Sequence, residues 1–222
     1  MADFTRYFPT LLANEGGYCH DAQDPGGETY RGIARAANPQ WGGWPAIDAV
    51  KARLGLTSPV PRPSWSSLNK ALLTEAALAA SINTFYKAAY WNPLGLDAVG
   101  CQCLAEQLAD HGVNAGTTRP AKMLQYLLST EFGAAGMVVD GKIGPRTIAA
   151  LNAANAEAFY RRFVAMRQAF YQYRAGTYTP AEASALAPWH AFFRDVLHLS
   201  TDARMKKFLT SWLSRTQAAY VA

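Results

Sequence analysis

A glutamate, an aspartate and a threonine in residues 15–29 are of the types that cleavage of a glycosidic bond requires. That reaction needs one carboxylic acid to protonate the leaving oxygen, and a second polar group to position water or stabilise the cationic sugar. Glu15 ends an apolar segment, and a partly apolar setting raises the pKa of an acid. Asp24 lies beyond a turn in a polar segment, where Thr29 is placed to hold a water beside it. A plain helix end followed by a loop is the alternative that residue types leave open.

Further candidates for substrate binding lie beside these residues and in the middle of the chain. Gly26 and Gly27 let the backbone approach a bulky polymer, and Tyr18 either stacks on a sugar ring or packs the hairpin. Asp110 and Asn114 are one helical turn apart. We expect them to face the cleft near Glu15, with a helix cap as the alternative.

Two other hydrolytic chemistries fit the sequence less well. A zinc amidase or peptidase needs two or three His or Cys ligands at suitable spacing, and His111, His190 and His198 show no such spacing. A cysteine hydrolase would use Cys19 as nucleophile with His20 or His111 as base. Adjacent residues rarely provide that geometry, and no third orienting group is evident.

The elements that must position residues 15–29 are a helix and a small sheet. Apolar residues at helical spacing predict a helix over residues 3–14, which ends before Gly16. Turn-forming residues over 17–34 predict a β-hairpin or a three-stranded sheet. Residues 38–68 are expected to form a loop around one short helix.

The rest of the chain has the periodicity of helices, so the predicted fold class is mainly α, an α+β fold with one small sheet. The expected helices lie within residues 69–91, 97–116, 117–133, 144–155, 156–176, 187–199 and 201–221. We expect a single globular unit over 1–222, with a catalytic part over about 1–115. A helical part over about 116–222 would pack against it.

Composition limits the partners and the compartment. The 222 residues carry a net charge of +5, which suits an anionic polymer, but no basic run favours nucleic acid. Neither a signal peptide nor a membrane-spanning segment is evident. Because three cysteines cannot all pair within one chain, we expect reduced thiols and synthesis in the cytoplasm.

The motif NEGGYCHDAQDPGGETYRGIA closely resembles the N-terminal signature of glycoside hydrolase family 108, whose members are lysozyme-like N-acetylmuramidases. The resemblance resumes at FYKAAYWNPLGLD and LADHGVNAGTTRPAKMLQ. It continues at VVDGKIGPRTIAAL, which is similar to a peptidoglycan-binding-type segment, and at FLTSWLSR. It implies that Glu15 is the catalytic acid. By a looser analogy with phage lysozymes, Asp24 and Thr29 orient the attacking water.

This resemblance implies bacterial peptidoglycan as substrate and cleavage between N-acetylmuramic acid and N-acetylglucosamine, without a metal or organic cofactor. We expect a monomer that acts in the periplasm or on the cell wall after release by a holin or a secretion system, as in a phage endolysin or a secretion activator. A non-catalytic peptidoglycan-binding or secretion-associated scaffold is the alternative. Residues 38–68 and 174–205 are longer than the family pattern and contain Trp41, Trp44, Trp65 and Trp189, which either extend a groove or cover the core.

Overall fold

The computed structural model describes residues 1–21 and 26–221, and the chain divides into two compact units. The N-terminal unit is Phe4–Ala89, and the helical unit is Met1–Asp3 with Tyr90–Ala222. The predicted fold class is confirmed, because the described residues form eleven α-helices and one three-stranded antiparallel sheet. The expected division into a catalytic and a peptidoglycan-binding part near residue 115 falls inside the helical unit and stays a prediction.

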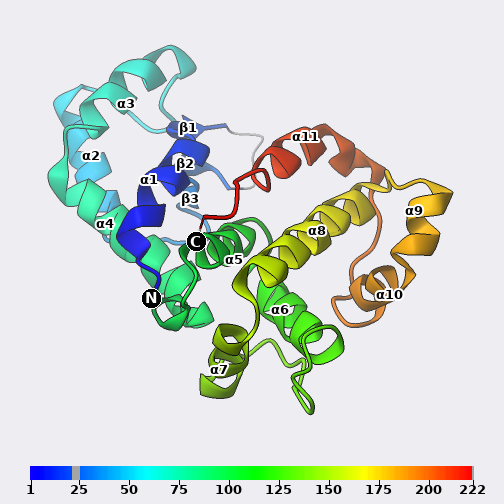
Figure 1. Ribbon diagram of the computed structural model, residues 1–222. Coiled ribbons are helices and arrows are strands. Elements are labelled where there is room, and N and C mark those ends of the chain that lie inside the picture. Colours follow the sequence, from blue (N-terminus) through cyan, green and yellow to red (C-terminus); the bar gives the residue numbers. More distant parts are fainter. Residues whose placement is uncertain (22–25, 222) are drawn as a thin grey trace. The chain divides into compact units, whose positions relative to one another are not determined.

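The N-terminal unit combines the sheet with short helices (Figure 1). Its elements are α1 (Phe4–Asn14), β1 (Tyr18–His20), β2 (Glu28–Tyr30), β3 (Ile33–Ala34), α2 (Trp44–Arg53), η1 (Arg62–Ser64), α3 (Trp65–Leu72) and α4 (Ala76–Tyr86). In the sheet, Cys19 pairs with Thr29 and Tyr30 pairs with Ile33. The apolar side chains of Leu11, Ile33 and Leu68 are completely buried in this unit and fix the sheet against its helices.

The predicted single helix within residues 69–91 is wrong, because the chain breaks at Leu73–Glu75 into α3 and α4. Thr74 donates a side-chain hydrogen bond of 2.8 Å to the carbonyl of Ala71, and Glu75 has an extended backbone. A threonine that bonds to nearby backbone competes with continuation of a helix. Residues 38–68 also contain more helix than expected, since α2, η1 and the start of α3 all lie there.

Helix α4 continues into a π-helical turn, η2 (Lys87–Trp91), after which the helical unit follows. The other elements of the helical unit are η3 (Asn92–Leu94), η4 (Leu96–Ala98), α5 (Gln102–Ala115), α6 (Thr118–Thr130), α7 (Pro145–Ala153), α8 (Ala156–Ala175), α9 (Pro180–Ala185), α10 (Ala187–Asp195), η5 (Ala203–Met205) and α11 (Lys206–Ser214). The expected helices over 117–133 and 156–176 correspond closely to α6 and α8.

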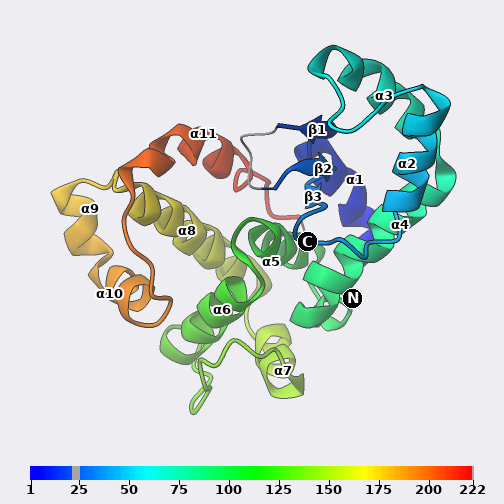
Figure 2. The same ribbon diagram turned by 180° about the vertical axis from the view of Figure 1, so that it is seen from behind.

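Helix α8 is the centre of the helical unit, and packs against α5, α6, α10 and α11 (Figures 1 and 2). It begins where the Asn155 side chain accepts a hydrogen bond of 2.9 Å from the Ala158 amide, and it ends at Gly176 in the left-handed conformation. Phe159, Phe163 and Met166 follow one another at helical spacing and are completely buried. This buried face gives the long helix contacts with neighbours on more than one side.

Candidate active site

Glu15 is the first residue after α1, and three backbone contacts fix its position. Its amide donates to the Leu11 carbonyl at 3.1 Å, so the last turn of the helix holds it. The guanidinium of Arg31 donates from Nη1 to the carbonyls of Leu12 at 3.1 Å and of Glu15 at 3.3 Å. A cation at the carboxyl end of a helix is favourable, because unsatisfied carbonyls gather there. The half-buried Glu15 side chain therefore starts from a fixed backbone.

The Glu15 carboxylate lies beside the turn between β2 and β3. A methyl group built on Gly32 would be 3.2 Å from Glu15 Cδ, and its distance to Oε2 would be below the 3.0 Å limit of real Cβ contacts. The same methyl group would be 2.7 Å from the Tyr86 hydroxyl, so that hydroxyl and the Glu15 carboxyl carbon are within 5.9 Å of one another. Gly32 thus provides the space in which these two side chains meet.

The turn itself has an unusual backbone. Arg31 and Gly32 have φ values of 50° and 73° and form the two-residue connection between paired Tyr30 and Ile33. Two positive φ values in a two-residue hairpin loop are the signature of a type I′ turn. A left-handed conformation is uncommon for arginine. The Tyr86 hydroxyl donates a hydrogen bond of 2.6 Å to the Arg31 carbonyl. Together with the hydrogen bonds from the Arg31 guanidinium, it offsets the energetic cost of the left-handed conformation.

The predicted partners of Glu15 are only partly described. Asp24 lies outside the described residues. Thr29 is half-buried in β2, and its hydroxyl donates to the Gly27 carbonyl at 3.3 Å. Gly27 has a φ of 59°, as the turn before β2 requires, and Gly26 is half-buried next to it. The roles of these residues in catalysis and substrate binding stay predictions.

Tyr18 occupies the interior of the sheet. Its ring is 2% exposed and meets the indole of Trp65 edge to face at 6.4 Å, and its hydroxyl donates to Glu28 at 2.9 Å. Burial, followed by the contact with Glu28, raises the pKa of Tyr18. Its backbone amide donates to Asn69 Oδ1 at 2.6 Å, and Gly17 leaves the room for that side chain. These contacts account for Tyr18 without a ligand, so its contact with a sugar stays a prediction.

An ion cluster with a buried centre, formed by Glu28 and Lys51, holds the sheet against α2. Glu28 is 7% exposed and pairs with Lys51 and Arg35, each at 2.6 Å. Asp48 joins the cluster at 2.7 Å from both cations. Burial raises the pKa of Asp48, but hydrogen bonds from Arg35 and Lys51 outweigh it and lower the pKa overall. Because Glu28 adjoins Thr29 in β2, this cluster fixes the strand that carries the predicted site residue.

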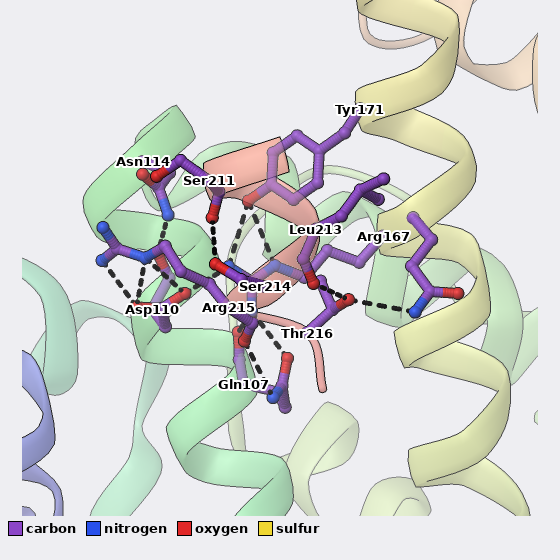
Figure 3. A network of polar contacts seen from close by, with 11 residues as sticks. Gln107, Asp110, Asn114, Arg167, Tyr171, Ser211, Leu213, Ser214, Arg215 and Thr216 are labelled. Carbon is purple, nitrogen blue, oxygen red and sulfur yellow. Dashed lines mark hydrogen bonds and ion pairs between the residues drawn. The ribbon is translucent and has the colours of Figure 1, made fainter. Parts of the chain in front are cut away.

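Asp110 belongs to a polar network inside the helical unit (Figure 3). Its carboxylate is 7% exposed, and it pairs with Arg167 and, at 2.6 Å, with Arg215. Arg167 is completely buried and also donates to Gln107 Oε1 at 2.6 Å and to the Tyr171 hydroxyl at 3.0 Å. The network joins α5, α8 and the end of α11. These contacts account for Asp110 without a substrate, and its role in substrate binding stays a prediction.

Asn114 lies one turn beyond Asp110 on α5 and is exposed. Its side-chain amide donates to the Asp110 carbonyl at 3.1 Å, as a residue near a helix end often does. The helix ends directly after it, at Ala115, with Gly116 in a positive-φ conformation. Asn114 therefore borders the surface next to the network, where it also lines a cavity described below.

The tryptophans of the two long segments have different environments. Trp44 and Trp189 are 2% and 3% exposed and belong to the core. Trp65 donates from its indole nitrogen to the Val60 carbonyl at 2.9 Å. Trp41 is half-buried and, with Phe85, lines an open apolar depression of the N-terminal unit. Two of the four tryptophans, Trp44 and Trp189, therefore cover the core.

Sequence reasoning missed Arg31, Gly32 and Tyr86, which surround the Glu15 side chain. The dipeptide Arg31-Gly32 between two short apolar-polar runs was the available signal for a hairpin turn. No local pattern marks Tyr86, because its hydroxyl reaches the turn from a helix more than fifty residues later in the chain.

Two other kinds of site are absent from residues 1–21 and 26–221. No group of three His, Cys, Asp or Glu side chains in that part of the chain is arranged to hold a metal ion. Of the described helices, none combines the length and apolar character needed to cross a membrane.

Comparison with known proteins identifies both parts of the chain. A family model described as Glycosyl hydrolase 108 matches residues 8–116, and one described as Predicted Peptidoglycan domain matches residues 119–217. No curated protein matches the chain. Among solved structures, a structure of Brucella abortus SagA is similar at 20% identity over 97% of each chain, with a TM-score of 0.47.

The two family matches follow one another over nearly the whole chain, and the first includes Glu15 and the sheet. The resemblance carried by the sequence motifs is therefore confirmed. A glycoside hydrolase region joined to a peptidoglycan domain makes this protein a peptidoglycan hydrolase of the lysozyme-like type, and its residues 8–116 belong to the glycosyl hydrolase 108 family.

Proposed function

We propose that the protein is an N-acetylmuramidase that cleaves the β-1,4 bond between N-acetylmuramic acid and N-acetylglucosamine, with Glu15 as the general acid. The observation that carries this proposal is the setting of the Glu15 carboxylate. Glu15 directly follows α1, and its carboxylate adjoins a turn in which a glycine leaves room for it and lies near the Tyr86 hydroxyl. This is a half-buried carboxyl on a fixed backbone inside the matched glycoside hydrolase region.

In the proposed reaction, protonated Glu15 donates its proton to the glycosidic oxygen while the bond to the anomeric carbon breaks. The sugar then carries positive charge, which a carboxylate or a positioned water must meet. Asp24 and Thr29 are the proposed groups for this second role, because both follow Glu15 closely in the sequence, within the same glycine-rich segment. Water attack completes hydrolysis and returns a proton to the site.

Rigid placement of the acid supports this assignment. General acid catalysis contributes about 10²- to 10⁴-fold to a rate and requires hydrogen-bond distance to the leaving oxygen. The Arg31 guanidinium bridges the end of α1 to the turn, and Tyr86 holds the same turn from α4. Three elements of the N-terminal unit thus converge on one carboxylate, as catalytic sites on rigid elements require.

The substitution Glu15→Gln tests the role of the acid, because it keeps the size of the side chain and removes its proton-donating carboxyl group. We expect the rate of peptidoglycan solubilisation to fall by at least about 10²-fold. Glu75→Gln is the matched control, since Glu75 is in the same unit and pairs with the exposed Arg53. The measurements are loss of turbidity of purified walls and co-sedimentation with those walls.

Loss of lysis with unchanged sedimentation would support the proposal. Lysis by Glu15→Gln at the rate of the Glu75→Gln control would show that another residue supplies the proton. If neither the wild type nor the control cleaves walls to which it binds, the chain acts as a binding scaffold instead.

A further inference from the structure

A cavity of the helical unit joins basic and aromatic side chains far from each other in the sequence. It has a volume of about 260 Å³, equivalent to roughly nine liquid waters. We call it the basic–aromatic pocket and define it by six of its lining residues, Asn114, Arg119, Tyr171, Arg174, His198 and Trp212. All of them belong to the helical unit, and none belongs to the site around Glu15.

The charge of the basic–aromatic pocket is positive. No carboxylate is among the described residues that line it, whereas Arg119 and Arg174 both do. Arg119 donates from Nη1 to the Ala115 carbonyl at 2.7 Å, and Arg174 donates from Nη1 to the Ser200 carbonyl at 2.6 Å. Within the described part of the chain, neither arginine pairs with a carboxylate. A guanidinium has five N–H donors, so most donors of each arginine remain for an anion.

Aromatic side chains also line the basic–aromatic pocket. The indole of Trp212 stacks on the Tyr171 ring with centroids 5.2 Å apart and an angle of 27° between the planes. Tyr171 is buried, but Trp212 is half-buried and keeps part of its surface open. Binding pockets for small molecules commonly combine such apolar walls with a few polar groups that fix orientation.

The polar network of Figure 3 makes this pocket rigid. Arg215 is three residues after Trp212 and pairs with Asp110 on α5, which fixes the end of α11. Arg167 pairs with the same carboxylate and donates to the Tyr171 hydroxyl, which fixes the ring beneath Trp212. The aromatic wall is therefore held by buried ion pairs before any ligand arrives, and a preformed site loses less entropy on binding.

His198 adds a backbone feature to the rim. Its φ is 51°, a left-handed conformation that is uncommon for residues other than glycine. Such strained residues cluster at ligand-binding sites, where the surrounding structure maintains them. His198 lies between Leu197 and Leu199, both buried, which hold the strained segment in place.

We propose that the basic–aromatic pocket binds a carboxylate-bearing part of peptidoglycan. Arg119 and Arg174 would hold the carboxylate, while Trp212 packs against the adjoining sugar ring or peptide. The carboxylate comes either from the stem peptide or, in glycan that carries no stem peptide, from the lactyl group of muramic acid. This inference rests on the proposed function, since it assumes that peptidoglycan is the substrate. It assigns a second contact, separate from Glu15, through which the helical unit retains the polymer.

Calorimetric titration of the full chain carrying Glu15→Gln tests this proposal without cleavage of the ligand. The ligands are a disaccharide-tripeptide muropeptide, the free stem peptide, N-acetylmuramic acid with an unsubstituted lactyl group, and a chitin oligosaccharide that has no carboxylate. The test variant adds Arg119→Gln and Arg174→Gln. The control variant adds Arg194→Gln, which removes an exposed arginine that pairs with its neighbour Asp195 in the same unit.

A hydrogen bond to a charged group contributes about 1.5–3 kcal/mol, which is about a 10- to 100-fold change in affinity. We expect the double substitution to weaken muropeptide binding at least 10-fold and the control substitution to leave it unchanged. The test variant and the control variant should bind the chitin oligosaccharide equally. Binding of the free stem peptide would identify its carboxylate as the ligand, and binding of N-acetylmuramic acid would identify the lactyl group. Equal muropeptide affinity for all variants would overturn the proposal.

Failure of this proposal can be told apart from failure of the proposed function. Reducing ends that the wild-type protein releases from peptidoglycan measure muramidase activity and so test the proposed function. Ligand affinities of variants that carry Glu15→Gln test the basic–aromatic pocket instead. Equal thermal unfolding midpoints verify that the arginine variants are folded. Trp212→Ala provides a second perturbation, and we expect it to weaken the same ligand without changing binding of the chitin oligosaccharide.

Discussion

Substitution of Gly32 by alanine should disable the active site without altering any side chain that performs chemistry. The new methyl group would lie 2.7 Å from the Tyr86 hydroxyl and closer still to Glu15 Oε2. Gly55→Ala is the matched control. Gly55 has a φ of 66°, close to the 73° of Gly32, but its methyl group would meet nothing within 4 Å.

The two variants share a conformational cost and differ in steric effect. Alanine in a left-handed conformation costs about 1–2 kcal/mol, so both variants should lose a similar free energy of unfolding. In Gly32→Ala, the Tyr86 oxygen must move from 2.7 Å to ordinary contact at 3.4 Å, and Glu15 Oε2 must move further. Displacement of a catalytic group by about 1 Å can cost on the order of 10²-fold in rate.

We therefore expect kcat on soluble glycan strands to fall about 10²-fold in Gly32→Ala and less than about two-fold in Gly55→Ala. Chemical denaturation of each variant measures the shared cost, and reducing-end release at saturating substrate measures kcat. A Gly32→Ala protein with the kcat of wild type would refute the assignment of Glu15 as the acid in this geometry. An equal loss in both variants would attribute the effect to backbone strain alone.

Two predictions concern the helical unit. Asp110→Asn leaves the buried guanidinium of Arg167 without its carboxylate, so we expect a loss of about 3–5 kcal/mol in unfolding free energy. Glu157→Gln, at an exposed residue that pairs with Arg161, should lower the free energy of unfolding by less than about 1 kcal/mol in denaturant titrations. Equal losses of unfolding free energy in the two variants would contradict the account of a buried network. The pKa of His111 is lowered well below 6.5, mainly because the side chain is buried and further because Arg167 and a second arginine are positively charged. The unfolded chain therefore binds a proton below pH 6.5 that the folded chain does not, and stability should fall as pH decreases, by at most about 1.4 kcal/mol per pH unit from this group. His111→Phe should reduce that slope between pH 5 and 6.5, and an unchanged slope would show that the histidine is protonated in the folded state.

The sequence was sufficient to predict the fold class and the long helices, because their signals are local. Apolar residues at helical spacing predicted the helix over 156–176, and the structure places its caps at Asn155 and Gly176. The break between α3 and α4 was not predictable from apolar spacing, since the pattern continues through it. It depends on a side-chain hydrogen bond of Thr74, which competes with the helix only in this context.

In the candidate site, too, some features depend on residues close together in the sequence and others on residues far apart. Glu15 and the glycine-rich turns lie close together in the sequence, so a motif could identify them. The setting of the Glu15 carboxylate depends on Tyr86, which reaches the turn from α4. The environment of Asp110 depends on Arg167 and Arg215, both on other helices, so spacing along α5 alone could not predict its ion pairs.

The most direct test of the central claim is chemical identification of the products from purified peptidoglycan. Wild type, Glu15→Gln and Glu75→Gln are incubated with the polymer, and the products are reduced with borohydride and identified by mass spectrometry. We predict muropeptides that end in reduced N-acetylmuramic acid from wild type and Glu75→Gln, and none from Glu15→Gln. Products that end in reduced N-acetylglucosamine, or intact glycan strands with cleaved peptides, would contradict the proposed muramidase.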